Sequence, residues 1–377
     1  MQRKIKILHV SESSETGGAE TVLLNIVNNL DERRYHSIVV LLKTGWLYER
    51  LEKSGISPIL LKSDRAYDVN FLLRLWSTVK KQDVEIIHSH LPGANAYSCL
   101  AGRAAGVPVV ATYHGMLSAC GKLRASEKLQ LFLVRNFSKK IVSVSDSLRQ
   151  ELIQLAKFPS SKLKTIYNGV DWDKFDRPFE KVTKMKELGV DSNDKVIGMV
   201  ANLKATKGYQ YFIRAAAIVA NSISQVKFLV IGEGEEGIKL AITEEVRLLG
   251  LGDKVRFLGF REDVPELLRM LDVFVLSSVS EGMSLSTVEA MGSGVPVVVT
   301  KSGGPQELVE DGRTGFLVPP RDENSLAEKV LFLLKNQGAS NEMAREARSY
   351  VRKEFSTDNM IENYETVYQE CLKEGGT

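Results

Sequence analysis

The stretch Val273–Ser302, VFVLSSVSEGMSLSTVEAMGSGVPVVVTKS, decides the fold class of this chain. Val273–Ser278 and Val295–Thr300 are short apolar runs rich in β-branched residues, which predicts two buried strands. Between them, Ser284–Met291 has room for about two helical turns before Gly292 and Gly294 end the helix. Two strands joined by a helical crossover form a βαβ unit, so the sequence predicts an α/β fold. In open α/β sheets the loop after such a strand is where ligands bind.

Two glutamates flank the start of that helix. Glu281 lies in the loop before it, and Glu289 follows eight residues later within it. The amides between them lie at the helix N-terminus, where unpaired N–H groups and the helix dipole favour an anion. The residues that would present these amides are Gly282, Met283, Ser284 and Leu285. An alternative stays open, because Ser286–Glu289 also fits a capping box in which Glu289 only caps the helix.

The string EGMSLSTVEAMGSGVPVV, which begins at Glu281, resembles the E-x7-E region of retaining, nucleotide-sugar-dependent glycosyltransferases. Within these enzymes, the string is most similar to the large GT-B group that is often called family 4. This resemblance implies that Glu281 holds the hydroxyls of the donor sugar and that Glu289 holds the ribose. It also implies that the amides of residues 282–285 meet the sugar and the diphosphate.

Length and composition limit the possible classes of protein. A chain of 377 residues suits two domains, and 44% hydrophobic with 26% charged residues is typical of a globular protein. The start, MQRKIKILHVSES, predicts a first strand rather than a signal peptide, and no apolar run is long enough for a membrane-spanning helix. Three scattered cysteines, Cys99, Cys120 and Cys371, lack metal-ligand spacing and indicate reduced thiols, as in a cytoplasmic protein.

The net charge of +3 is unevenly spread along the chain. Residues 1–175 hold 25 basic and 16 acidic residues, a net charge of +9, whereas residues 176–377 hold 25 basic and 31 acidic residues, a net charge of −6. The basic half is expected to meet something anionic. Nucleic acid is not an expected partner, since the sequence has no basic run with interleaved aromatics and no nucleic-acid motif.

The first half contains two candidate ligand positions. A glycine pair, Gly17-Gly18, separates a first strand at Lys4–Val10 from a helix, which can turn backbone amides toward an anion, although any tight turn also favours glycine. The strand Val107–Tyr113 ends in His114-Gly115. The string TYHG is similar to the His-Gly position of the family, which implies that His114 touches the donor sugar and is catalytic. His88 and His90 are interpreted as mainly structural, with an acceptor-side role as the alternative.

A domain boundary is expected near residue 172. The string IYNGVD at 166–171 resembles the segment before the family's hinge, and residues 172–190 show neither strand nor helix period, which predicts a linker. The first domain is therefore expected at 1–172 and the second at 173–356. The last helix, Thr357–Leu372, has an apolar stripe and by resemblance crosses back onto the first domain with the rest of 357–377.

The second domain opens with a strand, Lys195–Val200, and a loop that ends in Lys207-Gly208 before a helix. A cation and a glycine at a helix start can clamp a diphosphate, and the resemblance implies a phosphate-binding, catalytic role for Lys207. An exposed lysine is the alternative. Where Asn202 stands the family commonly has arginine, so one phosphate-facing cation is missing and weaker diphosphate binding or a different donor is expected.

The stretch Gly232–Gly237, GEGEEG, satisfies the G-x-G-x-x-G pattern of dinucleotide-binding proteins. Three glutamates in it would repel a pyrophosphate, and no acidic residue ends the next strand to hold a ribose, so a nicotinamide site is rejected. Gly232 and Leu258 are expected instead to line the pocket for the base and ribose.

Residues 120–140 mix leucine and phenylalanine with six basic residues. This pattern predicts a helix that either packs on the core with a solvated basic face or rests on anionic lipid.

These observations predict two doubly wound, Rossmann-like α/β domains that face each other across a cleft, the GT-B arrangement. The resemblance implies retaining transfer of a hexosyl or N-acetylhexosaminyl group from a nucleotide-diphosphate sugar, UDP favoured over GDP, in cell-surface polysaccharide synthesis. The expected acceptor is a glycan or a polyprenyl-diphosphate-linked sugar. No cofactor and no metal are expected. The protein is expected in the cytoplasm, with peripheral contact at the inner face of the membrane. Two alternatives are a phosphorylase-like enzyme of similar fold and a non-catalytic protein that binds sugar nucleotides.

Overall fold

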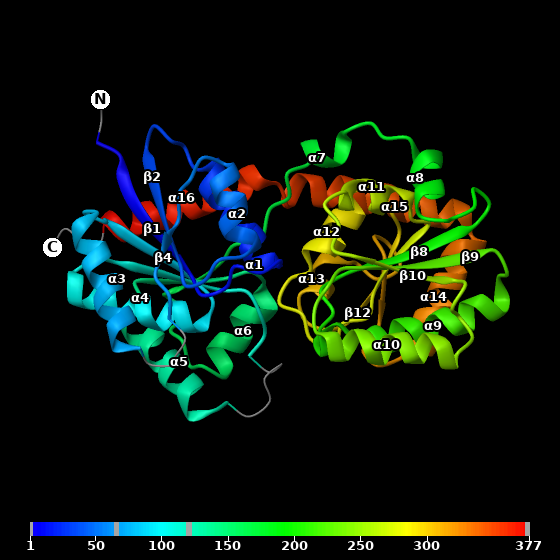
Figure 1. Ribbon diagram of the computed structural model, residues 1–377, viewed down its shortest axis with the longest axis horizontal. Helices are drawn as coiled ribbons and strands as arrows, with labels where there is room; N and C mark the ends of the chain where they lie inside the picture. The colour runs from blue at the N-terminus through cyan, green and yellow to red at the C-terminus, as the bar shows by residue number, and fades with distance from the viewer. Residues whose placement is uncertain (1–2, 64–67, 118–122, 374–377) are drawn as a thin grey trace. The chain divides into compact units, whose positions relative to one another are not determined.

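The computed structural model describes residues 3–63, 68–117 and 123–373. The chain forms two compact units: unit 1 comprises Met1–Gly169 and Thr357–Thr377, and unit 2 comprises Val170–Ser356. Each unit is a parallel sheet with helices on both sides (Figure 1). The predicted class, two Rossmann-like α/β domains, is confirmed.

The sheet of unit 1 has the strand order β3-β2-β1-β4-β5-β6-β7, and all its neighbouring strands are parallel. The order reverses between β1 and β4, which makes this pair the switch point where loops diverge. Its strands are β1 (Ile5–Ser11), β2 (Tyr35–Leu41), β3 (Ile59–Leu60), β4 (Ile86–His90), β5 (Val109–Tyr113), β6 (Lys140–Ser143) and β7 (Leu163–Thr165).

Seven helices cover this sheet in the described part of unit 1: α1 (Gly18–Asn29), α2 (Trp46–Lys53), α3 (Val69–Lys81), α4 (Pro92–Ala105), α5 (Ala125–Phe137), α6 (Asp146–Gln154) and α16 (Thr357–Lys373). The helix starts follow local chemistry, since Asp68 caps α3 and Ser145 caps α6 through side-chain oxygens. The C-terminal α16 packs against α1 and β4.

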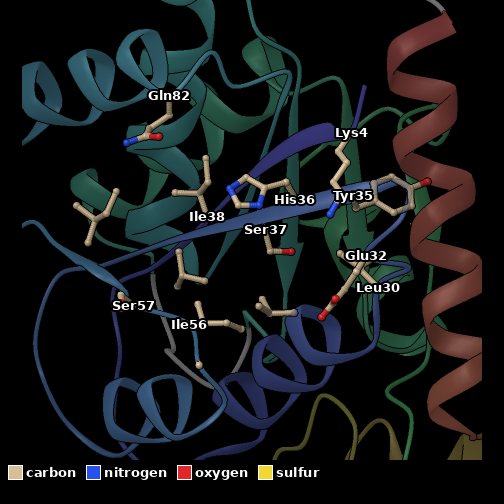
Figure 2. Close-up of a pocket in the computed structure, with 14 residues that line it drawn as sticks. Lys4, Leu30, Glu32, Tyr35, His36, Ser37, Ile38, Ile56, Ser57 and Gln82 are labelled. Atoms are coloured by element: carbon tan, nitrogen blue, oxygen red, sulfur yellow. The ribbon is translucent and has the colours of Figure 1, made fainter. Parts of the chain in front are cut away.

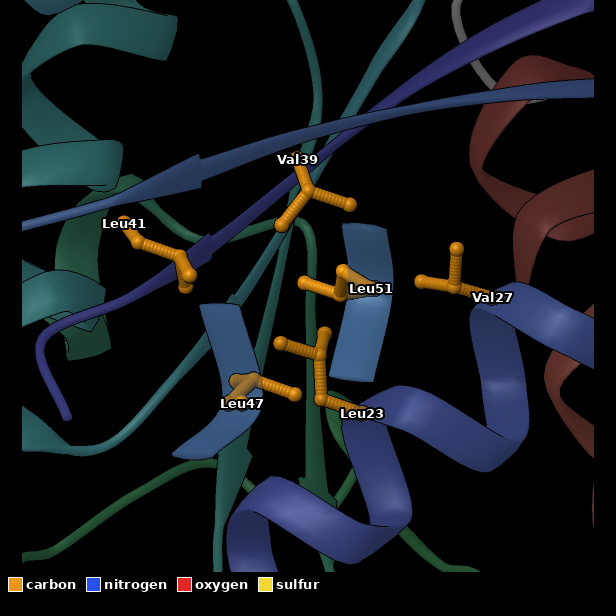
Figure 3. Close-up of a cluster of buried hydrophobic side chains, with 6 residues drawn as sticks. All are labelled: Leu23, Val27, Val39, Leu41, Leu47 and Leu51. Atoms are coloured by element: carbon orange, nitrogen blue, oxygen red, sulfur yellow. The ribbon is translucent and has the colours of Figure 1, made fainter. Parts of the chain in front are cut away.

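A cluster of aliphatic side chains joins α1, α2 and β2 (Figure 3). Leu23 and Val27 are four residues apart on α1, as Leu47 and Leu51 are on α2, so each pair lies on one helix face. The cluster is completed by Val39 and Leu41 from one face of β2. Burial of each such side chain stabilises the unit by about 1.5–3 kcal/mol.

Unit 2 repeats the design with the strand order β10-β9-β8-β11-β12-β13, and its switch point lies between β8 and β11. Its strands are β8 (Lys195–Val200), β9 (Val226–Ile231), β10 (Val255–Gly259), β11 (Val273–Leu276), β12 (Val297–Thr300) and β13 (Phe316–Val318). Its helices are α7 (Asp173–Asp176), α8 (Lys181–Glu187), α9 (Tyr209–Ser222), α10 (Glu236–Leu248), α11 (Val264–Met270), α12 (Leu285–Gly292), α13 (Pro305–Leu308), α14 (Glu323–Lys335) and α15 (Gln337–Glu354), with a 3-10 turn η2 (Ala205–Lys207).

Residues 172–190 are not the structureless linker that the sequence predicts, because they contain α7 and α8. Lys184 of α8 holds this segment on the unit, with its ammonium 2.8 Å from both Asp263 and Glu266. Hydrogen bonds to these two carboxylates raise the pKa of Lys184 above its ordinary value. Helices this short show no apolar period in sequence, so only their tertiary contacts reveal them.

Candidate active site

The first part of the site lies at the switch point of unit 2. Strands β8 and β11 are neighbours, and the loops that follow them contain Lys207 and Glu281 respectively. These two residues, 74 positions apart, form an ion pair and a hydrogen bond between the Lys207 ammonium and a Glu281 carboxylate oxygen. The hydroxyl of Ser278 also donates to that oxygen at 3.2 Å. The sequence predicts both residues as site residues but does not predict that they touch.

The pair is largely shielded from solvent, with 21% of the Lys207 side chain and 10% of the Glu281 side chain exposed. Partial burial strengthens the attraction between the charges compared with a surface pair. An anionic ligand at this position would compete with Glu281 for the Lys207 ammonium.

The backbone of Glu281 is fixed by the loop after β12. Its amide donates to the carbonyl of Ser302 at 2.8 Å, and its carbonyl accepts from the amide of Gly304 at 3.0 Å. A Cβ at Gly304 would lie 2.2 Å from the carbonyl oxygen of Gly282, so only glycine permits this approach. Residues 303–305 (Gly-Gly-Pro), which follow β12, therefore hold the backbone of the loop that contains Glu281.

Gly208 sets the position of the Lys207 backbone. Its φ of +64° is in the left-handed region, and a Cβ there would lie 2.2 Å from the carbonyl oxygen of Ser277. The Ser277 hydroxyl donates to the carbonyl oxygens of Gly208 at 2.9 Å and Lys207 at 3.2 Å. The end of β11 thus holds the end of the β8 loop, which explains why the cation and the carboxylate meet.

The N-terminus of α12 is the second part of the site. Ser284 is the capping residue, and its hydroxyl accepts from the amide of Thr287 at 3.2 Å. The alternative in which Ser286–Glu289 forms a capping box is therefore wrong. Among the described residues the amides of Gly282, Ser284 and Leu285 donate no hydrogen bond. Such amides at a helix N-terminus suit an anion.

Glu289 lies inside α12 and remains partly exposed, yet the protein around its carboxyl group excludes much of the water. This desolvation raises the pKa of Glu289 to about 7, against a smaller lowering by the charge of Lys174. The Glu289 carboxylate accepts no hydrogen bond from any residue that the structure describes. A ligand hydroxyl at this carboxylate would displace no protein partner, and the ribose contact of Glu289 stays a prediction.

The glycine-rich turn after β9 packs against the loop after β8. Gly232 has φ +138°, and a Cβ there would lie 2.1 Å from the carbonyl oxygen of Ala201. A Cβ at Gly234 would lie 2.4 Å from the carbonyl oxygen of Leu203. Close backbone packing thus accounts for the first two of the three glycines of this pattern without a dinucleotide. Asn202 and Leu258 are half-buried beside these turns.

The predicted site residues of unit 1 lie at the carboxyl ends of its strands. Gly17 precedes α1 as its capping residue, and no side chain caps this helix. His114 follows β5, and its Nε2 lies 3.0 Å from Nδ1 of His90. Burial lowers the pKa of His114 to about 4, so the imidazole is neutral at pH 7.

Comparison with known proteins assigns this chain to a family. The sequence pattern of the family described as "Glycosyl transferases group 1" matches residues 180–352, and that of "Glycosyltransferase Family 4" matches residues 16–174. The N-acetyl-alpha-D-glucosaminyl L-malate synthase of Bacillus anthracis is 30% identical over 82% of this chain and 80% of its own length. The chain belongs to glycosyltransferase family 4.

Two further relatives of this glycosyltransferase cover almost its whole length. The UDP-Gal:alpha-D-GlcNAc-diphosphoundecaprenol alpha-1,3-galactosyltransferase of Escherichia coli is 29% identical over 97% of both chains. The crystal structure of Anabaena HepE in complex with UDP-glucose has a TM-score of 0.89 and 26% identity, and covers 98% of this chain and 100% of HepE. The protein is accordingly a hexosyl- or N-acetylhexosaminyl-type glycosyltransferase.

Sequence reasoning about the glycosyltransferase missed Ser277, Ser278 and Lys174. The signal for the two serines was present, because polar residues directly after an apolar strand often reach a site. Lys174 carried no signal, since it lies in the segment expected to be a linker. Among the described residues no helix combines the length and the apolar character needed to cross a bilayer.

A cavity of about 520 Å³ lies elsewhere in unit 1, along β2 (Figure 2). Its lining includes Tyr35, His36 and Ser37 of β2, with Lys4 and Gln82. It contains none of the predicted site residues, so we do not assign it to the transfer reaction.

Proposed function

We propose that this glycosyltransferase moves a sugar, with retention of anomeric configuration, from a UDP-sugar to a glycan or a polyprenyl-diphosphate-linked acceptor during cell-surface polysaccharide synthesis. The observation that carries this proposal is the Lys207–Glu281 pair next to the N-terminus of α12. The UDP-glucose bound by HepE and the UDP-Gal donor and diphosphoundecaprenol acceptor in the name of the Escherichia coli relative support the donor and acceptor classes.

The pair suggests how the donor is held. When the diphosphate binds, its oxygens compete for the ammonium of Lys207, and Glu281 loses the partner it has in the free protein. The released carboxylate then accepts hydrogen bonds from hydroxyls of the donor sugar. The favourable charge contact is thereby exchanged rather than lost, and the sugar is positioned by the same event.

The same groups act on the leaving group. The bond between the anomeric carbon and the phosphate oxygen breaks, the acceptor hydroxyl oxygen bonds to that carbon on the same face, and its proton passes to the departing phosphate oxygen. Negative charge grows on the diphosphate, and Lys207 and the amides of Gly282, Ser284 and Leu285 stabilise it. The proposal assigns this role to the protein's own cation and amides, without a metal ion at the diphosphate.

The donor class is tested by thermal-shift titration with UDP, GDP, ADP and their sugars, with and without EDTA. Because a ligand that binds only the folded state raises the melting temperature by mass action, we expect a shift of several degrees with UDP species alone, unchanged by EDTA. A shift with inorganic phosphate but no nucleotide would favour the phosphorylase-like alternative. A UDP shift abolished by EDTA would overturn the metal-free assignment.

The same titration at pH 6 and pH 8 tests whether the charge of the Glu289 carboxylate contributes to UDP binding. Its pKa of about 7 means that the carboxylate is mostly ionised at pH 8 and mostly neutral at pH 6. An ionised carboxylate accepts hydroxyl hydrogen bonds more strongly, so we expect UDP to bind about threefold to tenfold more tightly at pH 8. Glu289→Gln should remove most of this pH dependence.

We further propose that unit 1 contacts anionic membrane through α3 and α5. Val69, Leu73 and Trp76 form an exposed apolar stripe on α3, with 66%, 56% and 39% of each residue exposed. Leu129 and Phe132 of α5 are 43% and 49% exposed. Helix α4 packs against both helices. Basic residues accompany both, namely Arg74, Lys80, Lys81, Arg124, Lys128 and Arg135, which suits an anionic lipid surface.

Replacing Leu73 by glutamate is expected to reduce co-sedimentation with vesicles of phosphatidylglycerol severalfold, because it removes apolar area and adds a repelled charge. Leu248→Glu on α10 of unit 2 is the matched control, since Leu248 is 68% exposed and should leave sedimentation unchanged. Equal sedimentation of the wild-type protein with anionic and neutral vesicles would refute the membrane contact.

A further inference from the structure

Four of the five histidines of the chain gather at one place in unit 1. His9 of β1 lies beside His88 of β4 in the strand register, and His90 lies two residues further along the same face of β4. Ring centroids are 5.5 Å apart for His9 and His88, and 4.2 Å apart for His88 and His90. The fourth, His114, stacks on His90 at 5.3 Å. Three of the four therefore lie on the two strands that form the switch point of this sheet, and His114 follows the neighbouring strand β5.

The hydrogen bonds of the cluster leave several nitrogens without partners. His88 is satisfied, because its Nδ1 lies 2.7 Å from the Tyr368 hydroxyl and its Nε2 lies 2.8 Å from the Thr112 hydroxyl. Both ring nitrogens of His9 are buried and have no hydrogen-bond partner among the described residues, and the same holds for Nε2 of His90. A buried polar group without a hydrogen-bond partner destabilises the folded state, so a bound ligand at these nitrogens would remove that cost.

We propose that His9, His88 and His90 form a binding site for one divalent transition-metal ion of the zinc class. Each of the three offers a ring nitrogen, and the three atoms lie within 4.8 Å of one another. A set made only of imidazoles suits Zn²⁺, Co²⁺, Ni²⁺ or Cu²⁺, whereas Mg²⁺ and Ca²⁺ require oxygen ligands. None of these three histidines takes part in the proposed diphosphate contacts, because the residues that make those contacts belong to unit 2.

The arrangement around the ligands also suits a metal. Metal-bound histidines usually use their second ring nitrogen in a hydrogen bond that fixes the ring. His90 does so, since its Nδ1 pairs with Nε2 of His114 at 3.0 Å while its Nε2 stays available. His88 can keep the Tyr368 hydroxyl on Nδ1 and exchange the Thr112 hydroxyl on Nε2 for the metal. His9 needs to break no hydrogen bond.

Protonation does not oppose binding, because a metal needs neutral imidazoles. Burial lowers the pKa of His9 to about 3 and keeps those of His88 and His90 well below their ordinary value. All three are therefore neutral at pH 7. Tetrahedral Zn²⁺ with Zn–N distances of about 2.0–2.1 Å places ligand nitrogens about 3.4 Å apart, so small ring rotations would close the site on the ion. His114, which stacks on His90, is itself partly exposed.

The test uses the full chain, freed of metal with a chelator and then offered ZnCl₂ or CoCl₂. We expect one equivalent of Zn²⁺ to remain after gel filtration and to raise the melting temperature, since the ion binds only the folded protein. X-ray absorption at the zinc edge should show a first shell of imidazole nitrogens. Less than about one tenth of an equivalent bound, or a first shell of oxygen alone, would overturn the proposal and leave a buried water as the occupant.

Two variants locate the site. His9→Asn removes a ligand without breaking a hydrogen bond. It is expected to weaken Zn²⁺ binding by about tenfold to a hundredfold. His36→Asn is the matched control, because His36 is the fifth histidine and is exposed on β2. Equal Zn²⁺ affinity of the His9 variant and the wild-type protein would overturn the proposal. If His9→Asn does not fold, the absorption spectrum of the wild-type protein decides by itself.

Discussion

Replacing Glu281 with glutamine is expected to lower kcat/KM for sugar transfer by about two to three orders of magnitude, and Glu281→Ala is expected to abolish transfer. Glutamine keeps the shape of the side chain but not its charge, so it neither holds Lys207 in the free protein nor accepts strongly from sugar hydroxyls. The loss of a charged hydrogen-bonding group that acts in the transition state has effects of this size. Transfer of labelled sugar from UDP-sugar measures it.

The fold should survive this change. The Glu281 backbone is held by Ser302 and Gly304 independently of its carboxylate, so only the side-chain contacts with Lys207 and Ser278 are affected. Glu245→Gln is the matched control, since Glu245 is another partly buried carboxylate of unit 2, paired with Arg214 at 2.6 Å. It should retain transfer. Turnover of Glu281→Gln near that of the Glu245 control would remove Glu281 from the site.

Lys207→Ala is expected to weaken UDP binding by about 10-fold to 100-fold and to lower kcat as well. The ammonium is the cation proposed for the diphosphate, and a hydrogen bond to a charged group contributes about 1.5–3 kcal/mol. The variant also leaves Glu281 unpaired, so its negative charge repels the diphosphate. Titration calorimetry with UDP and with uridine measures the effect, and uridine binding should be almost unchanged.

Lys204→Ala tests whether position matters rather than charge alone. Lys204 is exposed, three residues before Lys207 in the same loop, and should leave UDP binding within about twofold. The double variant Lys207→Ala with Glu281→Gln should bind UDP more tightly than the two single losses together predict, because the unpaired carboxylate is gone. Strictly additive losses would show that the ion pair has no part in donor binding.

The elements that sequence predicts well are those with a strong local pattern. The β-branched runs at β8, β9 and β12 occur as strands, and the apolar stripe of α16 occurs as one helix. α4 has no comparable stripe, because it is made largely of small residues and most of it is buried. α7 and α8 are too short for a period. Their existence depends on partners distant in sequence, such as Asp263 for Lys184.

The site shows the same division. The residue types and their spacing are sufficient to nominate Glu281, Glu289 and Lys207, because a carboxylate, a helix N-terminus and a cation beside glycine each have a local chemical meaning. That Lys207 and Glu281 form one pair follows only from the neighbouring positions of β8 and β11 in the sheet. The capping alternative for Glu289 could not be judged from sequence, since the helix begins one residue after Ser284 rather than after Ser286.

By itself the sequence determined that this protein is a two-domain α/β chain with the motifs of a sugar-nucleotide transferase, because strand and helix periods and glycine-flanked loops are local properties. The tertiary structure alone decided which of those motifs meet. Sheet order brings Lys207 to Glu281 and His9 to His88, and burial sets the pKa of Glu289 near 7 and keeps the histidine cluster neutral. Strand order and desolvation depend on contacts between distant residues, which no local pattern records.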